Sequence, residues 1–273
     1  MRLEDKVVVV TGGGGGIGRA ICQGCAREGA RVAIGEIVPE AGQAVVDEIE
    51  AAGGQALSVP VDVADTAQID GLFDRALAAY GRIDVMVNNA YGSPESLSGD
   101  GDLLSVPGDA WDRVMQTTLK SVFHASQRAV AEMVKTGGGS VVNMSSVNGT
   151  HAFGMVAYSS AKGAIIAMTR CASVQYASQG VRMNVICPGT IATASTVPFM
   201  EQVPGLREKT EAMYPCKRLG TPEEVANVAL FLASDESSFV NGAVFTVDGG
   251  VTVGPPSFAL VDEMEKVDWQ RPS

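Results

Sequence analysis

The sequence of 273 residues has little positive charge and no long uncharged apolar run. It carries 20 Lys and Arg residues against 31 Asp and Glu residues, a formal net charge of -11 at pH 7. This excess of negative charge opposes non-specific binding to nucleic acid or to anionic membranes. The sequence also shows no pattern of a membrane span or a signal peptide. We therefore expect a cytoplasmic protein that acts on a small molecule, without nucleic acid or membrane as a partner.

Cysteine is scarce and irregularly spaced. The five cysteines show no disulfide-framework spacing, so free thiols are the simpler interpretation. Cys22 and Cys25 match the C-x-x-C spacing of redox sites. Both fall within the first expected helix, where buried cysteines pack as small hydrophobic residues. Because no cluster of cysteine and histidine accompanies them, we expect no metal site.

Short apolar segments alternate with helical patterns along the whole chain. The expected strands are residues 7–10, 31–35, 56–60, 85–88, 140–144, 182–186 and 243–247. This alternation predicts an α/β fold, a Rossmann-like doubly wound parallel sheet of about seven strands with helices on both faces. We expect a single domain over residues 1–253. Residues 254–273 form a C-terminal extension that could cover a neighbouring subunit's pocket or fray.

Glycines occupy positions 12–16 and 18, directly after the first expected strand. In a doubly wound fold such a turn lies at the carboxyl edge of the sheet, where ligands bind. Glycines let the backbone approach phosphates closely, and the following helix N-terminus offers free N–H groups. The run fits G-x-G-x-x-G at Gly13, Gly15 and Gly18, although consecutive glycines fit it trivially. It predicts a dinucleotide site, with a flexible loop as the alternative.

Two acidic residues follow the next two strands. Glu36 comes just after the second expected strand, 18 positions beyond Gly18. A carboxylate there would accept hydrogen bonds from the adenosine ribose and repel a 2′-phosphate, which favours NAD over NADP. A solvated surface glutamate is the alternative. Asp62 is a candidate acceptor for the adenine amino group, with a helix N-cap as its competing role.

Tyr158 and Lys162 are the candidate chemical groups. Four residues apart on an expected helix, they share one face. A phenol has an unperturbed pKa of about 10, so a neighbouring ammonium is needed to favour the phenolate near neutral pH. Ser145 and Ser146 end the fifth expected strand, where a hydroxyl can share the reacting oxygen with the tyrosine. A surface tyrosine beside a solvated lysine is the alternative.

Several motifs in a fixed order give the chain a family resemblance. They are Thr11-Gly12-x3-Gly16-x-Gly18, Asp62, Asn88-Asn89-Ala90, Ser145-Ser146, Tyr158-x3-Lys162, Pro188-Gly189-Thr190-Ile191-x-Thr193 and Asp248-Gly249-Gly250. Over roughly residues 3–252 the chain resembles the short-chain dehydrogenases/reductases. Each motif is a weak signal alone, but their common order makes the resemblance specific.

The resemblance implies an NAD-dependent oxidoreductase that forms a homotetramer or a dimer. It implies that Tyr158 exchanges the proton of a substrate hydroxyl, that Ser146 orients this oxygen, and that Lys162 holds the nicotinamide ribose and lowers the tyrosine pKa. Hydride then passes between the substrate carbon and the nicotinamide. The implied cofactor residues are Gly12, Gly16, Ile17, Gly18, Glu36, Asp62, Val63, Asn88, Asn89, Ala90, Tyr158, Lys162, Pro188, Gly189, Ile191 and Thr193.

Three positions depart from the family pattern. Tyr91 stands where the family usually has glycine, so we expect its ring to border the substrate. Thr118 stands where an asparagine usually helps to hold a relay water; we place it in the catalytic set and expect its main-chain carbonyl to serve. The interval to Tyr158 is 11 residues from Ser146 and 12 from Ser145, and 12 is the commoner family value. Motif register favours Ser146, with Ser145 as the alternative.

The sequence says least about the substrate. Candidate wall residues are His151, Phe153, Met155, Val156, Phe199, Met200, Met213 and Tyr214, although each could equally be core. They favour an apolar secondary alcohol or its ketone, cyclic ones included. The prolines and glycine of residues 192–217 predict a mobile lid. A lyase or epimerase that uses bound NAD, and a dinucleotide-sensing protein without catalysis, are the alternative functions.

Overall fold

One parallel sheet organises the computed structural model, which describes residues 1–91 and 97–254. The strands are β1 (Val7–Thr11), β2 (Arg31–Glu36), β3 (Gln55–Pro60), β4 (Val85–Asn88), β5 (Gly139–Met144), β6 (Val181–Pro188) and β7 (Val244–Val247). Their order across the sheet is β3-β2-β1-β4-β5-β6-β7. This arrangement confirms the predicted fold class, and every expected strand is present with ends that agree within two residues. Apart from Gly254, the predicted C-terminal extension lies outside the described residues.

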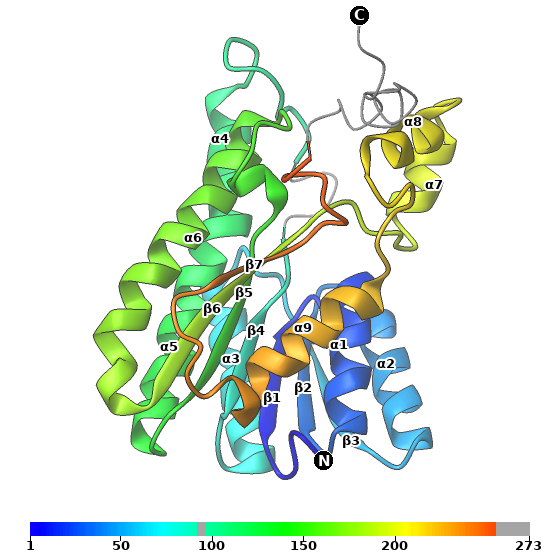
Figure 1. Cartoon of the computed structure of the whole chain (residues 1–273). Helices are drawn as coiled ribbons and strands as arrows, with labels where there is room; N and C mark the ends of the chain where they lie inside the picture. The colour runs from blue at the N-terminus through cyan, green and yellow to red at the C-terminus, as the bar shows by residue number, and fades with distance from the viewer. Residues whose placement is uncertain (92–96, 255–273) are drawn as a thin grey trace, which may run out of the picture.

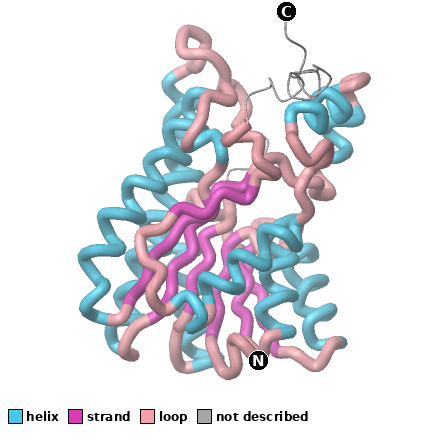
Figure 2. Tube along the Cα trace, viewed as in Figure 1, coloured by secondary structure: helices cyan, strands magenta, loops and turns pink. Residues whose placement is uncertain are grey.

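Helices cover both faces of the sheet (Figures 1 and 2). One face carries α1 (Gly16–Arg27), α2 (Pro39–Ala51) and α9 (Pro222–Ala233). The other face carries α3 (Thr66–Tyr80), α5 (Ser121–Lys135) and α6 (Val156–Tyr176). Among the residues described, no helix combines the length and the apolar character needed to span a bilayer.

The central strand β1 shows why the core has two layers. Val7 and Val9 pack on the α3 and α5 side, whereas Val8 and Val10 pack on the α1 and α9 side. Successive strand side chains point to opposite faces, so a strand covered on both faces is a continuous apolar run. The cysteines of α1 are buried in the second of these layers and carry free thiols, which agrees with their interpretation as packing residues.

The carboxyl edge of the sheet carries the remaining elements. The chain passes from α4 (Gly108–Val114) through a π-helical stretch, η1 (Met115–Lys120), directly into α5. After β6 it forms α7 (Thr196–Glu201) and α8 (Leu206–Met213), which Figure 1 shows beyond the strand ends. These two helices occupy much of the segment expected to form a lid. The order of the strands reverses between β1 and β4, which are neighbours in the sheet. In such a fold a ligand is expected at the carboxyl ends of these two strands.

Candidate active site

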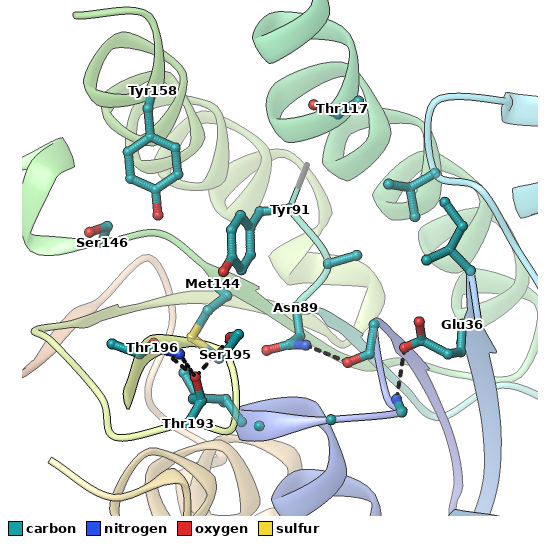
Figure 3. Close-up of a pocket in the computed structure, with 18 of the residues that line it drawn as sticks. Glu36, Asn89, Tyr91, Thr117, Met144, Ser146, Tyr158, Thr193, Ser195 and Thr196 are labelled. Carbon is teal, nitrogen blue, oxygen red and sulfur yellow. Dashed lines mark hydrogen bonds between the residues drawn. The ribbon is translucent and has the colours of Figure 1, made fainter. Parts of the chain in front are cut away.

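A cavity of about 1380 Å³ opens at the carboxyl edge of the sheet. Its walls come from the carboxyl ends of strands β1 to β6 and the loops that follow them, and from parts of α1, α4, η1 and α6. Pockets for small molecules usually measure about 300–1,000 Å³, so this cavity has room for a dinucleotide and a substrate together. Figure 3 shows Glu36 at one end and Tyr158 at the other.

The glycine turn lines one side of the cavity. Gly12 and Gly16 have φ values of 65° and 49°, in the left-handed region that favours glycine. A Cβ on Gly18 would lie 2.0 Å from the Gly12 carbonyl oxygen, so only glycine fits beneath the turn. Gly12, Gly16 and Ile17 line the cavity, whereas Gly18 packs under it. The result is a bare backbone cradle at a helix N-terminus, which fits a pyrophosphate.

Glu36, the last residue of β2, is held at the side of this cradle. Its Oε2 accepts a hydrogen bond from the Gly14 N–H at 2.9 Å, and its Oε1 accepts one from the Val38 N–H at 3.1 Å. Figure 3 shows the first of these bonds. The carboxylate is therefore fixed at the cavity wall, and is not a free surface group.

Asp62 and Val63 line the same end of the cavity. Asp62 Oδ1 accepts a hydrogen bond from the Ala64 N–H at 2.9 Å, which shapes the loop after β3. The N-cap of α3 is Asp65, whose side chain accepts from the Ala67 N–H. The alternative role of Asp62 as a helix N-cap is therefore wrong.

The two asparagines after β4 have different places. Asn88 is buried and donates to Ser126 Oγ and Asn143 Oδ1, so it joins β4 to α5 and β5 and lies away from the cavity. This corrects the expectation that Asn88 lines the nucleotide site. Asn89 and Ala90 do line it, and Asn89 Nδ2 donates to the Gly12 carbonyl at 2.9 Å. Strand alternation explains the difference, because adjacent side chains project to opposite sides.

Tyr158 and Ser146 lie at the other end of the cavity (Figure 3), and Lys162 lines it beside Tyr158. Lys162 Nζ lies 5.5 Å from the centre of the Tyr158 ring and donates to the Met144 carbonyl at 2.8 Å. The Ser146 hydroxyl lies beside the phenol (Figure 3), and its Oγ donates to Asn148 Oδ1 at 3.3 Å. Ser145 Oγ instead donates to the Lys162 carbonyl at 2.8 Å and fastens β5 to α6. Of the two serines, the structure thus brings Ser146 against the phenol.

Burial controls the ionisation of Tyr158 and Lys162. Burial raises the pKa of Tyr158, and the neighbouring Ser146 hydroxyl partly offsets that rise. Burial also lowers the pKa of Lys162 to about 8, because the fully enclosed ammonium loses its hydration. That Lys162 lowers the tyrosine pKa during the reaction stays a prediction, since burial dominates the phenol here.

Tyr91 places a second aromatic ring in the cavity. Its ring centre lies 6.4 Å from that of Tyr158, with the planes at 69°, an edge-to-face arrangement. Lys162 Nζ lies 5.8 Å from the Tyr91 ring centre, so the lysine is bracketed by two tyrosines. Burial raises the pKa of Tyr91 as well. The bulky residue at the usual glycine position therefore narrows the cavity beside the phenol.

The Pro-Gly segment after β6 closes the cavity beside α1. Pro188, Gly189, Ile191 and Thr193 all line it, as the sequence predicts for a cofactor site. Thr193 Oγ1 forms hydrogen bonds with Ser195 Oγ at 3.0 Å and Thr196 Oγ1 at 2.8 Å, a hydroxyl cluster shown in Figure 3.

Thr118 lies away from the cavity. It is fully buried within η1, and Thr117 lines the cavity in its place. Within the described part of the chain, Thr118 Oγ1 has no hydrogen-bond partner. The Thr118 side chain therefore does not reach the cavity, and the place of Thr118 in the catalytic set stays a prediction. The helix is nevertheless distorted as a carbonyl relay requires, since the Ser121 N–H bonds to Gln116, five residues back; the role of the Thr118 carbonyl stays a prediction.

The apolar wall predicted from the sequence is wrong in its members. None of the eight candidate residues lines the large cavity. Phe153, Phe199 and Met213 are exposed, while Met200 and Tyr214 pack with Leu219 in a small separate core. The wall beside Tyr158 consists instead of Tyr91 and Met144. Met144 was missed, although its position at the end of β5, directly before the two serines, was an available signal.

No group of three or more potential metal ligands occurs within residues 1–91 and 97–254.

The chain is similar to known proteins along nearly all its length. Residues 12–252 match a family model described as enoyl-(acyl carrier protein) reductase. The chain is 39% identical to the 3-oxoacyl-(acyl-carrier-protein) reductase FabG of Thermotoga maritima, an alignment that covers 93% of this chain and 100% of the relative. It is 35% identical to 2,5-dichloro-2,5-cyclohexadiene-1,4-diol dehydrogenase LinX of Sphingobium indicum, with 93% of this chain and 98% of the relative covered.

A solved structure shares the fold closely. It is a 7 alpha-hydroxysteroid dehydrogenase complexed with NADH and 7-oxo glycochenodeoxycholic acid, with a TM-score of 0.84 and 33% sequence identity. The superposition covers 91% of this chain and 95% of that chain.

Proposed function

Because the chain belongs to the short-chain dehydrogenase/reductase family of NAD(P)-dependent oxidoreductases, we propose that it interconverts apolar secondary alcohols, cyclic ones included, and their ketones with NAD. The observation that carries the proposal is the meeting of Ser146 and Tyr158 at one end of a cavity whose other end holds the glycine turn and Glu36. A proton-transfer group and a dinucleotide cradle thus share one cavity.

The chain's own side chains account for the proton and for orientation. In alcohol oxidation, Tyr158 takes the hydroxyl proton while the Ser146 hydroxyl holds the substrate oxygen in line. Lys162, within reach of the phenol ring, stabilises the phenolate that must form in this buried place. When bound, NAD supplies the other half of the chemistry by accepting hydride from the substrate carbon. The Thr118 carbonyl is proposed to complete the proton route to Lys162.

The cofactor is proposed to lie along the cavity from Glu36 to Lys162. Asn89, Ala90 and the glycine turn would hold its phosphates, because the cradle offers backbone groups without intruding side chains. Asp62 and Val63 would flank the adenine, and Ile191 and Thr193 the nicotinamide amide. Glu36 favours NAD, since its fixed carboxylate would repel a 2′-phosphate.

The proposal of an apolar substrate rests on the ring of Tyr91 and on Met144 beside the phenol. A flat aromatic face and a thioether suit a hydrocarbon ring better than a polyol. The names of two similar proteins, a cyclohexadiene diol dehydrogenase and a hydroxysteroid dehydrogenase, support the cyclic part of the proposal.

A substrate panel tests this function. Cyclohexanol, 1-phenylethanol and 2-butanol would be offered as apolar alcohols, and sorbitol as a polar control, each with NAD and with NADP. We expect reduced nicotinamide to accumulate with the apolar alcohols and NAD, most rapidly with cyclohexanol and 1-phenylethanol, which both contain a ring. Turnover of sorbitol alone would refute the apolar substrate class, and no turnover with any alcohol or matching ketone would refute the function.

The proposed catalytic unit is one domain over residues 1–253, and we expect it to assemble as a homo-oligomer. Phe239 and Val174 are strongly exposed apolar residues, which supports burial against another copy. Analytical ultracentrifugation tests this expectation, and a monomer at micromolar concentration would contradict it.

A further inference from the structure

The helix that carries Tyr158 has no cap of its own. α6 begins at Val156, and its N-cap residue, Met155, has φ 56° and ψ 79° and makes no side-chain capping bond. The first four N–H groups of a helix have no partner within the helix and need other acceptors. Tyr158 is the third residue of this turn, so whatever accepts these bonds also fixes the base of the phenol.

A distant loop supplies the missing acceptors. Asp100 Oδ1 accepts a hydrogen bond from the Ala157 N–H at 3.0 Å, and Asp100 Oδ2 accepts one from the Tyr158 N–H at 2.8 Å. The neighbouring Gly101 carbonyl accepts from the Val156 N–H at 3.0 Å. One carboxylate thus serves two helical N–H groups from a position 58 residues before the tyrosine.

The loop is itself held in place. Asp100 Oδ1 also accepts from the Gly101 N–H at 2.9 Å, which orients the carboxylate. Leu97 packs on the cluster of Val114, Ala157 and Ala161, between α4 and α6. The cap is therefore delivered by a packed segment, and a carboxylate at a helix N-terminus is favoured by the helix dipole.

We propose that Asp100 is a positioning residue for Tyr158, and this inference rests on the proposed function of that tyrosine. Ser146 stands on the loop after β5, whereas Tyr158 stands on α6. Their alignment therefore depends on where the first turn of α6 sits against the sheet. Asp100 fixes that turn through the Tyr158 main chain, without touching substrate or cofactor. Small displacements of reacting groups reduce turnover steeply.

Asp102 offers a matched control from the same loop. Its carboxylate accepts from the Leu104 N–H at 3.0 Å and from Ser105 Oγ at 2.7 Å, and so caps a turn of the loop itself. Asp102→Ala removes the same charge two residues away, without loss of a bond to α6.

The experiment compares Asp100→Ala, Asp100→Asn and Asp102→Ala with the native chain, using cyclohexanol and saturating NAD. We expect Asp100→Ala to lower kcat by at least about tenfold, with the Kd for NADH changed by less than about twofold, as read by nicotinamide fluorescence. Asp100→Asn keeps one acceptor oxygen and should recover part of the loss. Asp102→Ala should leave kcat within about twofold of native.

Amide hydrogen exchange of residues 156–159, measured by mass spectrometry, reads the cap without any turnover. We expect faster exchange there in Asp100→Ala and native exchange in Asp102→Ala. Unchanged exchange in Asp100→Ala would overturn the inference, as would equal kcat values for Asp100→Ala and Asp102→Ala. Absence of alcohol oxidation by the native chain would refute the proposed function instead, and exchange would still decide whether Asp100 caps α6.

Discussion

Glu36 gives the sharpest test of cofactor choice, because its carboxylate is anchored. Two main-chain N–H groups, of Gly14 and Val38, hold its two oxygens at the cavity wall. Among the described residues that line the cavity, the basic side chains are Arg113 and Lys162. Arg113 is ion-paired with Asp109 at 2.5 Å, and Lys162 lies at the opposite end, beside Tyr158. Within the described part of the chain, no basic side chain on this wall therefore offsets the charge of Glu36.

The expected magnitude follows from Coulomb's law. Two unit charges about 4 Å apart repel by about 1 kcal/mol in bulk water and by about 4 kcal/mol at the effective dielectric of a protein surface. The cavity is open to solvent, so the lower part of this range applies. A penalty of at least about 1.4 kcal/mol against a 2′-phosphate corresponds to about tenfold in kcat/KM. Glu36→Gln removes the charge while keeping an acceptor oxygen, so it should erase most of that factor.

The assay measures kcat/KM for NAD and for NADP with one alcohol, at low and at high salt. The native chain should prefer NAD by at least about tenfold, and Glu36→Gln should lower the preference by about the same factor. High salt should narrow the native preference, because ions screen the repulsion. Glu40→Gln is the matched control, since Glu40 is an exposed glutamate of the first turn of α2 that lies off the cavity. Equal native use of both cofactors, or an unchanged ratio in Glu36→Gln, would refute the reasoning.

Three further substitutions test the catalytic end of the cavity. Tyr158→Phe should lower kcat by at least about 100-fold with nearly native NADH affinity, and more than about a tenth of native kcat would contradict its role. Thr118→Val removes a buried hydroxyl that has no hydrogen-bond partner in the described structure. If the main-chain carbonyl serves the proton relay, kcat should fall by no more than about threefold, which is under about 0.7 kcal/mol in activation free energy. A hundredfold loss would assign the proton relay to the hydroxyl. Lys162→Met tests the pKa of about 8, which burial depresses below the unfolded value of 10.5. Between pH 8 and pH 10 the unfolded native chain therefore binds more protons than the folded chain. Its free energy of unfolding in urea, measured relative to that of Lys162→Met, should rise by about 2 kcal/mol over this range, and the gain is lost as the pH falls through about 8. A difference that does not change with pH would contradict the lowered pKa of Lys162.

Features encoded within a few consecutive residues were predictable. Runs such as Val7 to Val10 predicted strands because β-branched residues buried on both faces make continuous apolar segments. Tyr158 and Lys162 were placed together because a helix brings residues four apart to one face. Glu36 and the glycine turn were found because both lie where neighbouring strands end, at the same edge of the sheet.

Features that depend on the exit direction of a strand or on packing between distant segments were not predictable. Asn88 and Asn89 differ by one position, and only the register of β4 turned the first into the core and the second toward the turn. Ser145 and Ser146 were separated in the same way, by the bond of Ser145 to the Lys162 carbonyl. The predicted apolar wall failed because hydrophobicity alone does not say which core, or which exposed face, a side chain joins.

The sequence by itself determined the parallel α/β architecture, the dinucleotide cradle and the pairing of Tyr158 with Lys162, because each follows from local periodicity or from a short motif. The tertiary structure decided which hydroxyl faces the phenol, that Tyr91 narrows the cavity, and that Asp100 caps α6. The physical reason is that the free N–H groups at an uncapped helix N-terminus can donate to any suitably placed carboxylate. The packing of Leu97 between α4 and α6 places the Asp100 carboxylate at this helix end. The residues near Tyr158 in the sequence contain no pattern that predicts it.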